Sequence, residues 1–219
     1  MLTIEEIGAV LRSRRSDDPV FVPDHSCASV AMILVADTSD MEVCFIRRAT
    51  RIGDPWSGQV AFPGGRASIG DSCPEEVAER ETREEVGLVL KSTDRIGKLP
   101  IRDVQRRDLR DSLTLTPVLY QIPLERRDLA HAKDRDEVSR VFWVPVRHLF
   151  DKDAVTSINY TIGGHNNTYP GILYEDNISK ISGNVFLEWI DTGLLNFSAN
   201  DSCFEKTSFW IFHSSSELI

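Results

Sequence analysis

Three glutamates with the spacing of one helix face are the residues of this sequence most suited to chemistry. Glu81, Glu84 and Glu85 stand at positions i, i+3 and i+4, so on a helix their side chains project from one side. Like charges at these spacings destabilise an isolated helix by roughly 0.2–0.5 kcal/mol per pair. A divalent cation would reverse that repulsion, and carboxylate oxygens suit a hard ion such as Mg²⁺. The pattern therefore indicates a metal site, with a solvated acidic helix face as the alternative.

The residues around the glutamates predict a short helix behind a glycine turn. Ser72 and Glu75 have the spacing of a capping box, which places the start of the helix near residue 73. Gly87 suits the position just past the end of a helix. The glycine pair at 64–65 allows the backbone to approach a ligand closely. A narrow packing face is predicted from apolar and small residues that recur every four positions: Ala78, Thr82 and Val86.

Two neighbouring runs resemble the signature of a known family. Residues 64–71 (GGRASIGD) and 80–88 (RETREEVGL) are similar to the Nudix box, a glycine-started loop and helix that end in an acidic pattern. The match departs from the family pattern in three ways. Gly65 is one residue further from Arg80 than is usual, Asp71 takes the place of the loop glutamate, and Thr82 replaces an aliphatic residue.

This resemblance implies both a fold and a reaction. The fold would be an α/β (α+β) arrangement, the Nudix α/β/α sandwich around a mixed sheet, and the reaction would be hydrolysis of a diphosphate with Mg²⁺ or Mn²⁺ as cofactor. Glu81 and Glu85 carry over as metal ligands, Glu84 as a further ligand or water-orienting base, and the Gly65 carbonyl as a backbone ligand. Arg80 would hold a neighbouring glutamate in place, with a plain surface ion pair as the alternative.

A second acidic segment, residues 136–146 (DEVSRVFWVPV), resembles the loop and strand that close a Nudix domain near its active site. Glu137 would then supply a further metal ligand or the general base, although a carboxylate in a loop can also simply cap it or face water. The catalytic residues expected from the resemblance are therefore Glu84, Glu85 and Glu137.

The run that precedes the glycine turn bears on the substrate. Residues 47–62 (RRATRIGDPWSGQVAF) resemble the upstream signature of the coenzyme A diphosphatase branch. The spacing from Arg48 to Gly58 is one residue longer than usual, and 54–57 (DPWS) differs from the usual sequence. Arginines suit phosphate groups, but at a strand end they are commonly solvated, and Phe62 also fits a core position. The candidate substrate-binding residues are Arg47, Arg48, Arg51, Gln59 and Phe62.

Composition divides the chain near residue 157. Residues 157–219 carry 9 charged side chains in 63 positions, against 50 in the 156 positions before them. We therefore expect a Nudix domain over 1–156 and a low-charge extension over 157–219 that is packed on or appended to it. Expected elements are a helix at 3–14, strands at 29–36, 43–47, 94–99, 115–122 and 141–144, and a short helix from Pro145 toward Phe150.

Two further segments have a predicted role. Residues 106–111 (RRDLRD) predict a charged surface loop that would form part of a lid. In the extension, Tyr169-Pro170 matches an element of the coenzyme A branch, whereas 189–193 (WIDTG) matches the following element poorly.

A net charge of −9 argues against nucleic acid or an anionic membrane surface as a partner. A small anionic substrate remains compatible if metal ions screen the site. No run approaches the roughly 18 apolar residues of a membrane span, and acidic residues follow the first four positions. We expect a soluble cytoplasmic protein, with an organelle not excluded and the question of a homodimer open.

The leading functional expectation is cleavage of coenzyme A or acyl-coenzyme A to 3′,5′-ADP and (acyl-)phosphopantetheine. One alternative is a general Nudix pyrophosphatase that acts on nucleotide derivatives such as ADP-ribose, dinucleotides or nucleoside triphosphates. Another is a Nudix-like binding module without catalysis. Three crowded acids disfavour this last alternative, because a binding module has no need to maintain them.

Overall fold

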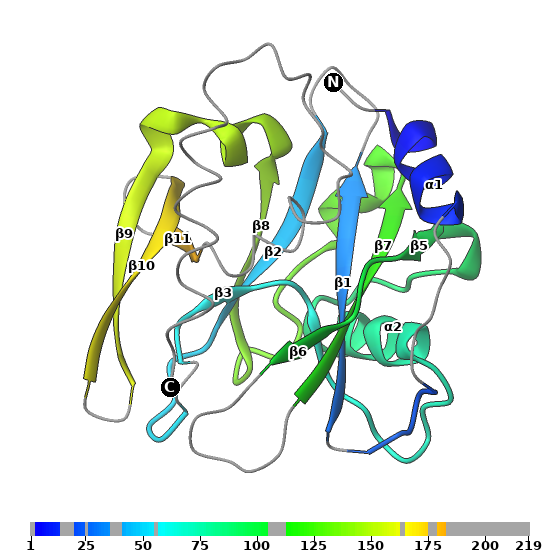
Figure 1. The fold of residues 1–219 in the computed structure, drawn as a ribbon, viewed down its shortest axis with the longest axis horizontal. Helices are drawn as coiled ribbons and strands as arrows, with labels where there is room; N and C mark the ends of the chain where they lie inside the picture. Colours follow the sequence, from blue (N-terminus) through cyan, green and yellow to red (C-terminus); the bar gives the residue numbers. More distant parts are fainter. Residues whose placement is uncertain are drawn as a thin grey trace.

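Two β-sheets and two α-helices make up the part of the chain that the computed structural model describes, namely residues 3–13, 20–24, 26–35, 41–54, 57–104, 113–162, 165–174 and 179–182 (Figure 1). The helices are α1 (Ile4–Ser13) and α2 (Pro74–Glu85). The larger sheet contains β1 (Cys27–Val35), β2 (Glu42–Arg48), β3 (Val60–Ala61), β4 (Gly64–Arg66), β5 (Arg95–Lys98), β6 (Arg102–Val104), β7 (Leu113–Ile122) and β8 (Val138–Pro145). The smaller sheet contains β9 (Val155–Ile162), β10 (His165–Tyr174) and β11 (Ser179–Ser182). Short 3₁₀ helices lie at Ser92–Asp94, Leu124–Leu129, Val146–Phe150 and Lys152–Ala154.

The larger sheet is mixed, as expected. Its central pair, β1 and β7, runs parallel from Cys27 opposite Thr114 to Val35 opposite Ile122. Every other pairing in this sheet is antiparallel: β2 and β4 join β1, β3 and β8 join β2, and β5 and β6 join β7. The strand order β3-β2-β1-β7-β5 therefore places β1 at the centre, next to the glycine-containing β4.

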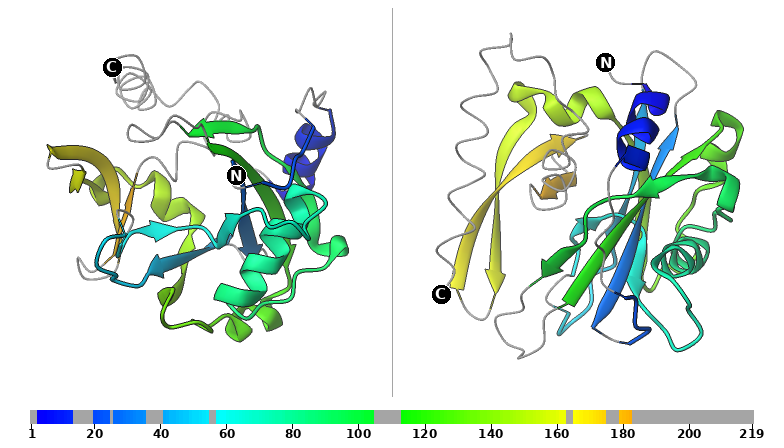
Figure 2. Two further views of the ribbon diagram at one scale, coloured as in Figure 1. Left: turned by 90° about the horizontal axis from the view of Figure 1, so that it is seen from below. Right: turned by 45° about the vertical axis from the view of Figure 1, so that its right-hand side comes forward.

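The two helices cover opposite faces of this sheet. Successive side chains of a strand point to opposite faces, and along β1 the residues Met32 and Leu34 join the core under α1, whereas Ala31 and Ile33 join the core under α2. Figure 2 shows α1 (dark blue) and α2 (blue-green) on either side of the central strands. The expected α/β/α sandwich is confirmed.

The smaller sheet packs on the α1 side of the larger one. Ile172 of β10 belongs to the same core as α1. The Tyr174 hydroxyl donates to the Trp143 carbonyl at 2.8 Å, and the Tyr174 ring stacks on Phe142 with centroids 6.0 Å apart. Residues beyond 156 thus contact the first domain directly. The expected boundary at 156/157 falls inside β9, and the division into two parts stays a prediction.

Each element that was predicted within the described residues is present, with differences only at its ends. The predicted helix at 3–14 is α1, the five predicted strands are β1, β2, β5, β7 and β8, and the short helix after Pro145 is the 3₁₀ helix Val146–Phe150. Strands β3, β4 and β6 and the smaller sheet were not predicted. The predicted lid at 106–111 and the 189–193 segment lie outside the described residues. Within the described ranges, no helix is long and apolar enough to cross a membrane.

Candidate active site

Two glycines let the chain pass tightly between β1 and the acidic helix. Gly64 has a φ of +154°, and a Cβ at this position would overlap the Ser29 carbonyl oxygen and the Val30 Cα. At Gly65, a Cβ would lie 2.6 Å from Glu81 Oε1, which is too close for a real contact. A side chain at Gly64 is therefore excluded by the backbone of β1. A side chain at Gly65 would displace the Glu81 carboxylate, which packs directly on the backbone of the turn.

The start of α2 differs from the predicted capping box. Cys73 is the N-cap residue and Pro74 occupies the first helical position, where its missing N–H costs nothing. The Ser72 backbone N–H and hydroxyl both donate to Glu76 Oε2 at 2.7 Å. The predicted Ser72–Glu75 pairing is thus wrong by one residue, because Pro74 shifts the helix start and brings Glu76 into reach.

The end of α2 and its packing face follow the sequence pattern. Gly87, at φ +75°, follows the C-cap residue Val86, whose N–H donates to the Thr82 carbonyl at 2.9 Å. Ala78, Thr82 and Val86 are fully buried against the sheet, which confirms the predicted packing face. Glu85 is also only 3 % exposed, so the acidic face continues into the interior.

Arg80 ties the glycine loop to the glutamates. Its Nε and Nη2 donate to Asp71 Oδ1 at 3.1 Å and Oδ2 at 2.9 Å, a bidentate pair. Its Nη1 donates to Glu81 Oε1 at 2.8 Å and to Glu84 Oε2 at 3.2 Å. The hydrogen bonds from Arg80 are the main reason why the pKa of the buried Asp71 carboxyl lies below its ordinary value. Asp71 therefore serves as the partner of Arg80 in this structure, a contact that the sequence analysis did not foresee.

Two of the three glutamates are removed from water. The pKa of Glu85 is raised to about 8, mainly by burial and also by the neighbouring charges of Glu81 and Glu137, against a hydrogen bond from the Gly64 N–H and the charge of Arg48. The Gly64 N–H donates to Glu85 Oε2 at 2.9 Å. Burial also raises the pKa of Glu81, against the hydrogen bond from Arg80. A nearby cation would compensate these carboxylates.

Glu84 faces an open pocket of ≈650 Å³. The pocket is lined by Glu84 and a charged segment: Lys133, Asp134, Arg135, Asp136 and Glu137. Glu137 was predicted to lie at the site, whereas Lys133 and Arg135 were not, although the high density of charged residues just before β8 pointed to this segment. Glu84 of the acidic helix and the Glu137 segment therefore line the same pocket.

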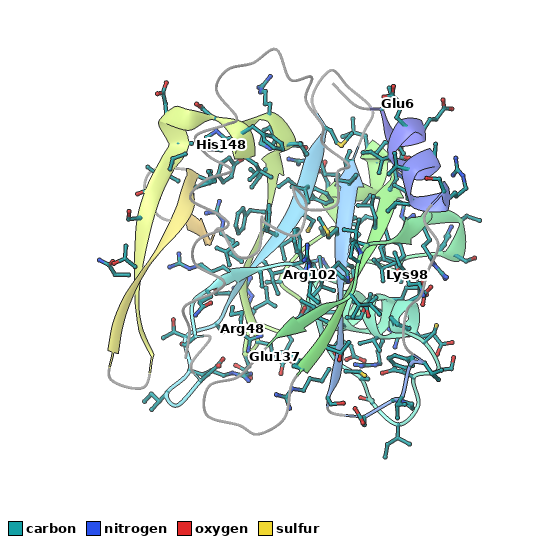
Figure 3. All side chains as sticks on the ribbon, in the orientation of Figure 1. Glu6, Arg48, Lys98, Arg102, Glu137 and His148 are labelled. Carbon is teal, nitrogen blue, oxygen red and sulfur yellow. The ribbon has the colours of Figure 1, made fainter. Side chains whose placement is uncertain are left out.

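The arginine run reaches this site only in part. Arg48 and Glu137 lie next to one another at the ends of β2 and β8 (Figure 3), where the Ala49 N–H donates to the Glu137 carbonyl at 2.8 Å. Arg48 Nη2 donates to Asp54 Oδ2 at 3.0 Å, and Arg51 Nη1 lies 3.7 Å from Glu137 Oε1. Two of the predicted arginines thus lie at the edge of the pocket.

The other three predicted substrate contacts are placed differently. Val43 and Phe45 of β2 face α1, and by the alternation of a strand Arg47 belongs to the same face. The Arg47 Nε donates to the Gly58 carbonyl at 3.4 Å. Gln59 is half-buried, with its carbonyl accepting from the Arg48 N–H at 2.9 Å. Phe62 is 5 % exposed and stacks on Phe45 with ring centroids 4.9 Å apart. Because its ring lies in the core on the α1 side, the proposed substrate contact of Phe62 is withdrawn.

The donor chemistry of the site fits a divalent cation, although the carboxylates do not converge. Among the described residues, no three His, Cys, Asp or Glu side chains are arranged so that they would hold a metal ion as they stand. The crowding of buried carboxylates beside a side-chain-free turn nevertheless matches the oxygen ligands of a hard cation. The metal roles of Glu81, Glu84, Glu85 and Gly65 stay predictions.

Comparison with known proteins agrees with this arrangement. The NUDIX domain model matches residues 26–162. The chain is 31 % identical over 159 residues to human mitochondrial coenzyme A diphosphatase NUDT8, covering 72 % of this chain and 60 % of that protein. It is 31 % identical over 161 residues to Nudix hydrolase 3 of Caenorhabditis elegans, covering 70 % and 65 % of the two chains. These matches span less than two thirds of either relative.

Solved structures were compared as well. A MutT/nudix family protein from Enterococcus faecalis superposes with a TM-score of 0.49 at 18 % identity, over 87 % of this chain and 74 % of that one. A score at this level adds nothing to the assignment, which rests on the domain match. That match covers more than half of the sequence, and this chain therefore belongs to the Nudix family.

Proposed function

We propose that this chain is a metal-dependent hydrolase that cleaves the diphosphate bond of a substrate containing a nucleoside diphosphate. The observation that carries the proposal is the pair formed by buried Glu85 and half-buried Glu81, beside the glycine turn and next to an open charged pocket. Burying like charges together is costly unless a cation joins them. Nudix domains typically use divalent metal ions, and Mg²⁺ or Mn²⁺ is the cofactor we expect here.

Each residue of the site has a role in this proposal. Glu81, Glu85 and the Gly65 carbonyl would hold the ion, with Glu84 as a further ligand. A bound divalent ion neutralises phosphate oxygens and lowers the pKa of a water molecule. Arg80 fixes Glu81 and Glu84 through its hydrogen bonds. This arrangement orients the carboxylates before a substrate arrives.

Hydrolysis also needs a base for the attacking water, which loses a proton as its oxygen bonds to phosphorus and the bridging P–O bond breaks. Glu137 is our candidate, because its half-exposed carboxylate lines the pocket and influences both buried glutamates. Glu84 and Glu85 are the alternatives. A base of this kind contributes typically about 10²–10⁴-fold to the rate.

Coenzyme A or an acyl-coenzyme A is the substrate we favour, with 3′,5′-ADP and (acyl-)phosphopantetheine as products. Support comes from the name of the human relative, a coenzyme A diphosphatase, and from Arg48 and Arg51 at the edge of the pocket. Arginine suits phosphate groups because its planar donors match their oxygens. A nucleic-acid partner is not part of this proposal, since the net charge is −9.

A substrate panel tests the assignment. The purified chain is incubated with Mg²⁺ or Mn²⁺ and with coenzyme A, acetyl-coenzyme A, ADP-ribose, a dinucleotide or a nucleoside triphosphate, and products are identified by mass spectrometry. We expect 3′,5′-ADP from both coenzyme A substrates. If the chain turned over another compound of the panel strongly but not coenzyme A, the coenzyme A assignment would be wrong and a general pyrophosphatase would take its place. Binding without turnover of any member would favour the binding module.

A further inference from the structure

The segment that carries Glu137 is attached to the end of α2 by three hydrogen bonds. The backbone N–H groups of His131 and Lys133 donate to the carbonyls of Val86 and Glu85, each at 3.0 Å. The ammonium group of Lys133 donates to the Arg83 carbonyl at 3.2 Å. These carbonyls belong to the last turn of a helix, where they lack partners within the helix and favour a positive charge.

Gly87 adds a steric component to this attachment. A Cβ at Gly87 would lie 2.7 Å from the His131 Cε1 atom, so the imidazole packs on the bare backbone. The same glycine has a φ of +75°, which side chains rarely tolerate. Gly87 therefore both ends α2 and provides the surface on which the segment starting at His131 is seated.

The other end of the segment is attached to β2. The Glu137 carbonyl accepts from the Ala49 N–H at 2.8 Å, and the Ser139 hydroxyl donates to the Arg47 carbonyl at 3.0 Å. Glu137 thus lies at the second of two attachment points, at the start of the arginine run, and the first is on the acidic helix. A shift at either point would move its carboxylate relative to Glu85.

We propose that Lys133 is a positioning residue that fixes the Glu137 carboxylate relative to α2. Among the described residues 131–137, the Lys133 ammonium group is the only side-chain donor that hydrogen-bonds α2, and its removal leaves only the two backbone hydrogen bonds of His131 and Lys133. The catalytic consequence rests on the proposed function; the structural consequence does not. The competing role is a direct contact of Lys133 with substrate phosphate, because this residue also lines the pocket.

Kinetics of Lys133→Met in the presence and absence of Glu137→Gln distinguish these roles. A positioning role predicts that Lys133→Met lowers kcat about tenfold or more, with KM changed less than about threefold. In the Glu137→Gln background the same change would have little further effect, because the group it positions is gone. Lys133→Arg, which keeps the charge and the donors, would retain most of the activity. A rise in KM that persists in the Glu137→Gln background would overturn the proposal in favour of substrate binding.

Amide hydrogen exchange tests the attachment without any assay of activity. Loss of one charge-assisted hydrogen bond predicts roughly tenfold faster exchange of the amides of residues 131–137 in Lys133→Met. Arg135→Met removes the same charge from the same segment and should leave this exchange unchanged. Unaltered exchange in Lys133→Met would refute the proposal even if the chain hydrolyses coenzyme A. If exchange became faster in Lys133→Met but the wild type hydrolysed no substrate, the structural role of Lys133 would stand and the proposed function would be refuted.

Discussion

The acidic helix and the arginine run are held in different ways. On α2, Arg80 connects Asp71, Glu81 and Glu84 in one network, and Glu85 is 3 % exposed. In the arginine run, the side chains of Arg48 and Arg51 are 34 % and 45 % exposed, and each has one ion pair. The fold thus fixes the helix carboxylates proposed to hold the metal ion and leaves the arginines proposed for recognition partly exposed. Changes in the first region should alter kcat and stability, and changes in the second should alter KM.

The largest effect is expected from breaking the Arg80 network. Arg80→Met removes the cation that pairs with the Asp71 carboxylate, which is 6 % exposed and would keep only the hydrogen bond from the Ser68 N–H. Breaking a buried pair costs at most about 3–5 kcal/mol. Activity should also fall by about 10–100-fold, because Glu81 and Glu84 lose the donor that orients them. Urea unfolding and steady-state kinetics measure the two effects.

Arg83→Met is the matched control for this change. Arg83 lies on the same helix with 57 % exposure, and its nearest recorded carboxylate contact, to Glu84, is at 3.9 Å. Its loss should change stability by no more than about 0.5 kcal/mol. Equal losses in both variants would show that the network around Arg80 has no special role.

The next effect concerns the pH dependence of stability. The pKa of Glu85 is raised to about 8 in the folded chain. At pH values between the ordinary pKa of a glutamate and about 8, the metal-free folded chain therefore binds more protons than the unfolded chain. Stability should therefore be highest at acidic pH in this window and fall as pH rises toward 8, by up to about 1.4 kcal/mol per pH unit. The raised pKa of Glu81 acts in the same direction. The lowered pKa of Asp71 affects stability only at lower pH: the stability that this carboxylate contributes is lost as pH falls through its pKa.

Urea unfolding in a chelator at several pH values measures this dependence. Glu85→Gln should flatten the curve and make the metal-free chain more stable than the wild type near pH 8. Glu84→Gln removes the same charge from a half-exposed position and should follow the wild type. Parallel curves for wild type and Glu85→Gln would contradict the burial of a proton-binding carboxyl.

A smaller and kinetically different effect is expected in the arginine run. Arg48→Gln should raise KM by about tenfold, because one charge-assisted hydrogen bond to the substrate would be lost, and should change kcat less. Arg12→Gln, on α1 at the opposite face of the sheet, removes the same charge and should leave both constants unchanged. A fall in kcat at constant KM for Arg48→Gln would mean that the two regions do not divide chemistry and recognition.

The smallest effect is a gain in stability on the packing face of α2. Thr82 is fully buried, and its hydroxyl has no hydrogen-bond partner in the described part of the chain. Thr82→Val keeps the shape and removes the unpaired hydroxyl, so it should stabilise the chain by about 1 kcal/mol. Thermal unfolding would show a rise of about 2–4 °C. A lower melting temperature would mean that Thr82 has a partner in solution.

Local patterns in the sequence predicted much of this arrangement. The fourfold spacing of Ala78, Thr82 and Val86 identified the packing face, and the position of Gly87 identified the helix end. Both depend on residues within one or two helical turns, where spacing alone fixes geometry. The same holds for the apolar strands β1, β2 and β7.

Contacts between distant or irregular segments were not predictable in this way. Asp71 meets Arg80 across a turn, and Lys133 reaches Arg83 from 50 positions away, so spacing gives no indication of either contact. Phe62 is adjacent in sequence to the glycine turn but its ring faces the α1 core. The smaller sheet was missed because polar residues such as those of 165–168 (HNNT) lack a clear apolar alternation.

Binding of Mn²⁺ to the wild type and to Glu85→Gln tests the central claim most directly. Titration near neutral pH, followed by electron paramagnetic resonance, counts free Mn²⁺ without requiring a substrate. We predict that the wild type binds the ion and that Glu85→Gln binds it at least about tenfold more weakly, while Arg83→Met binds as the wild type does. Equal affinity in the wild type and Glu85→Gln would contradict the assignment of the acidic helix as a metal site.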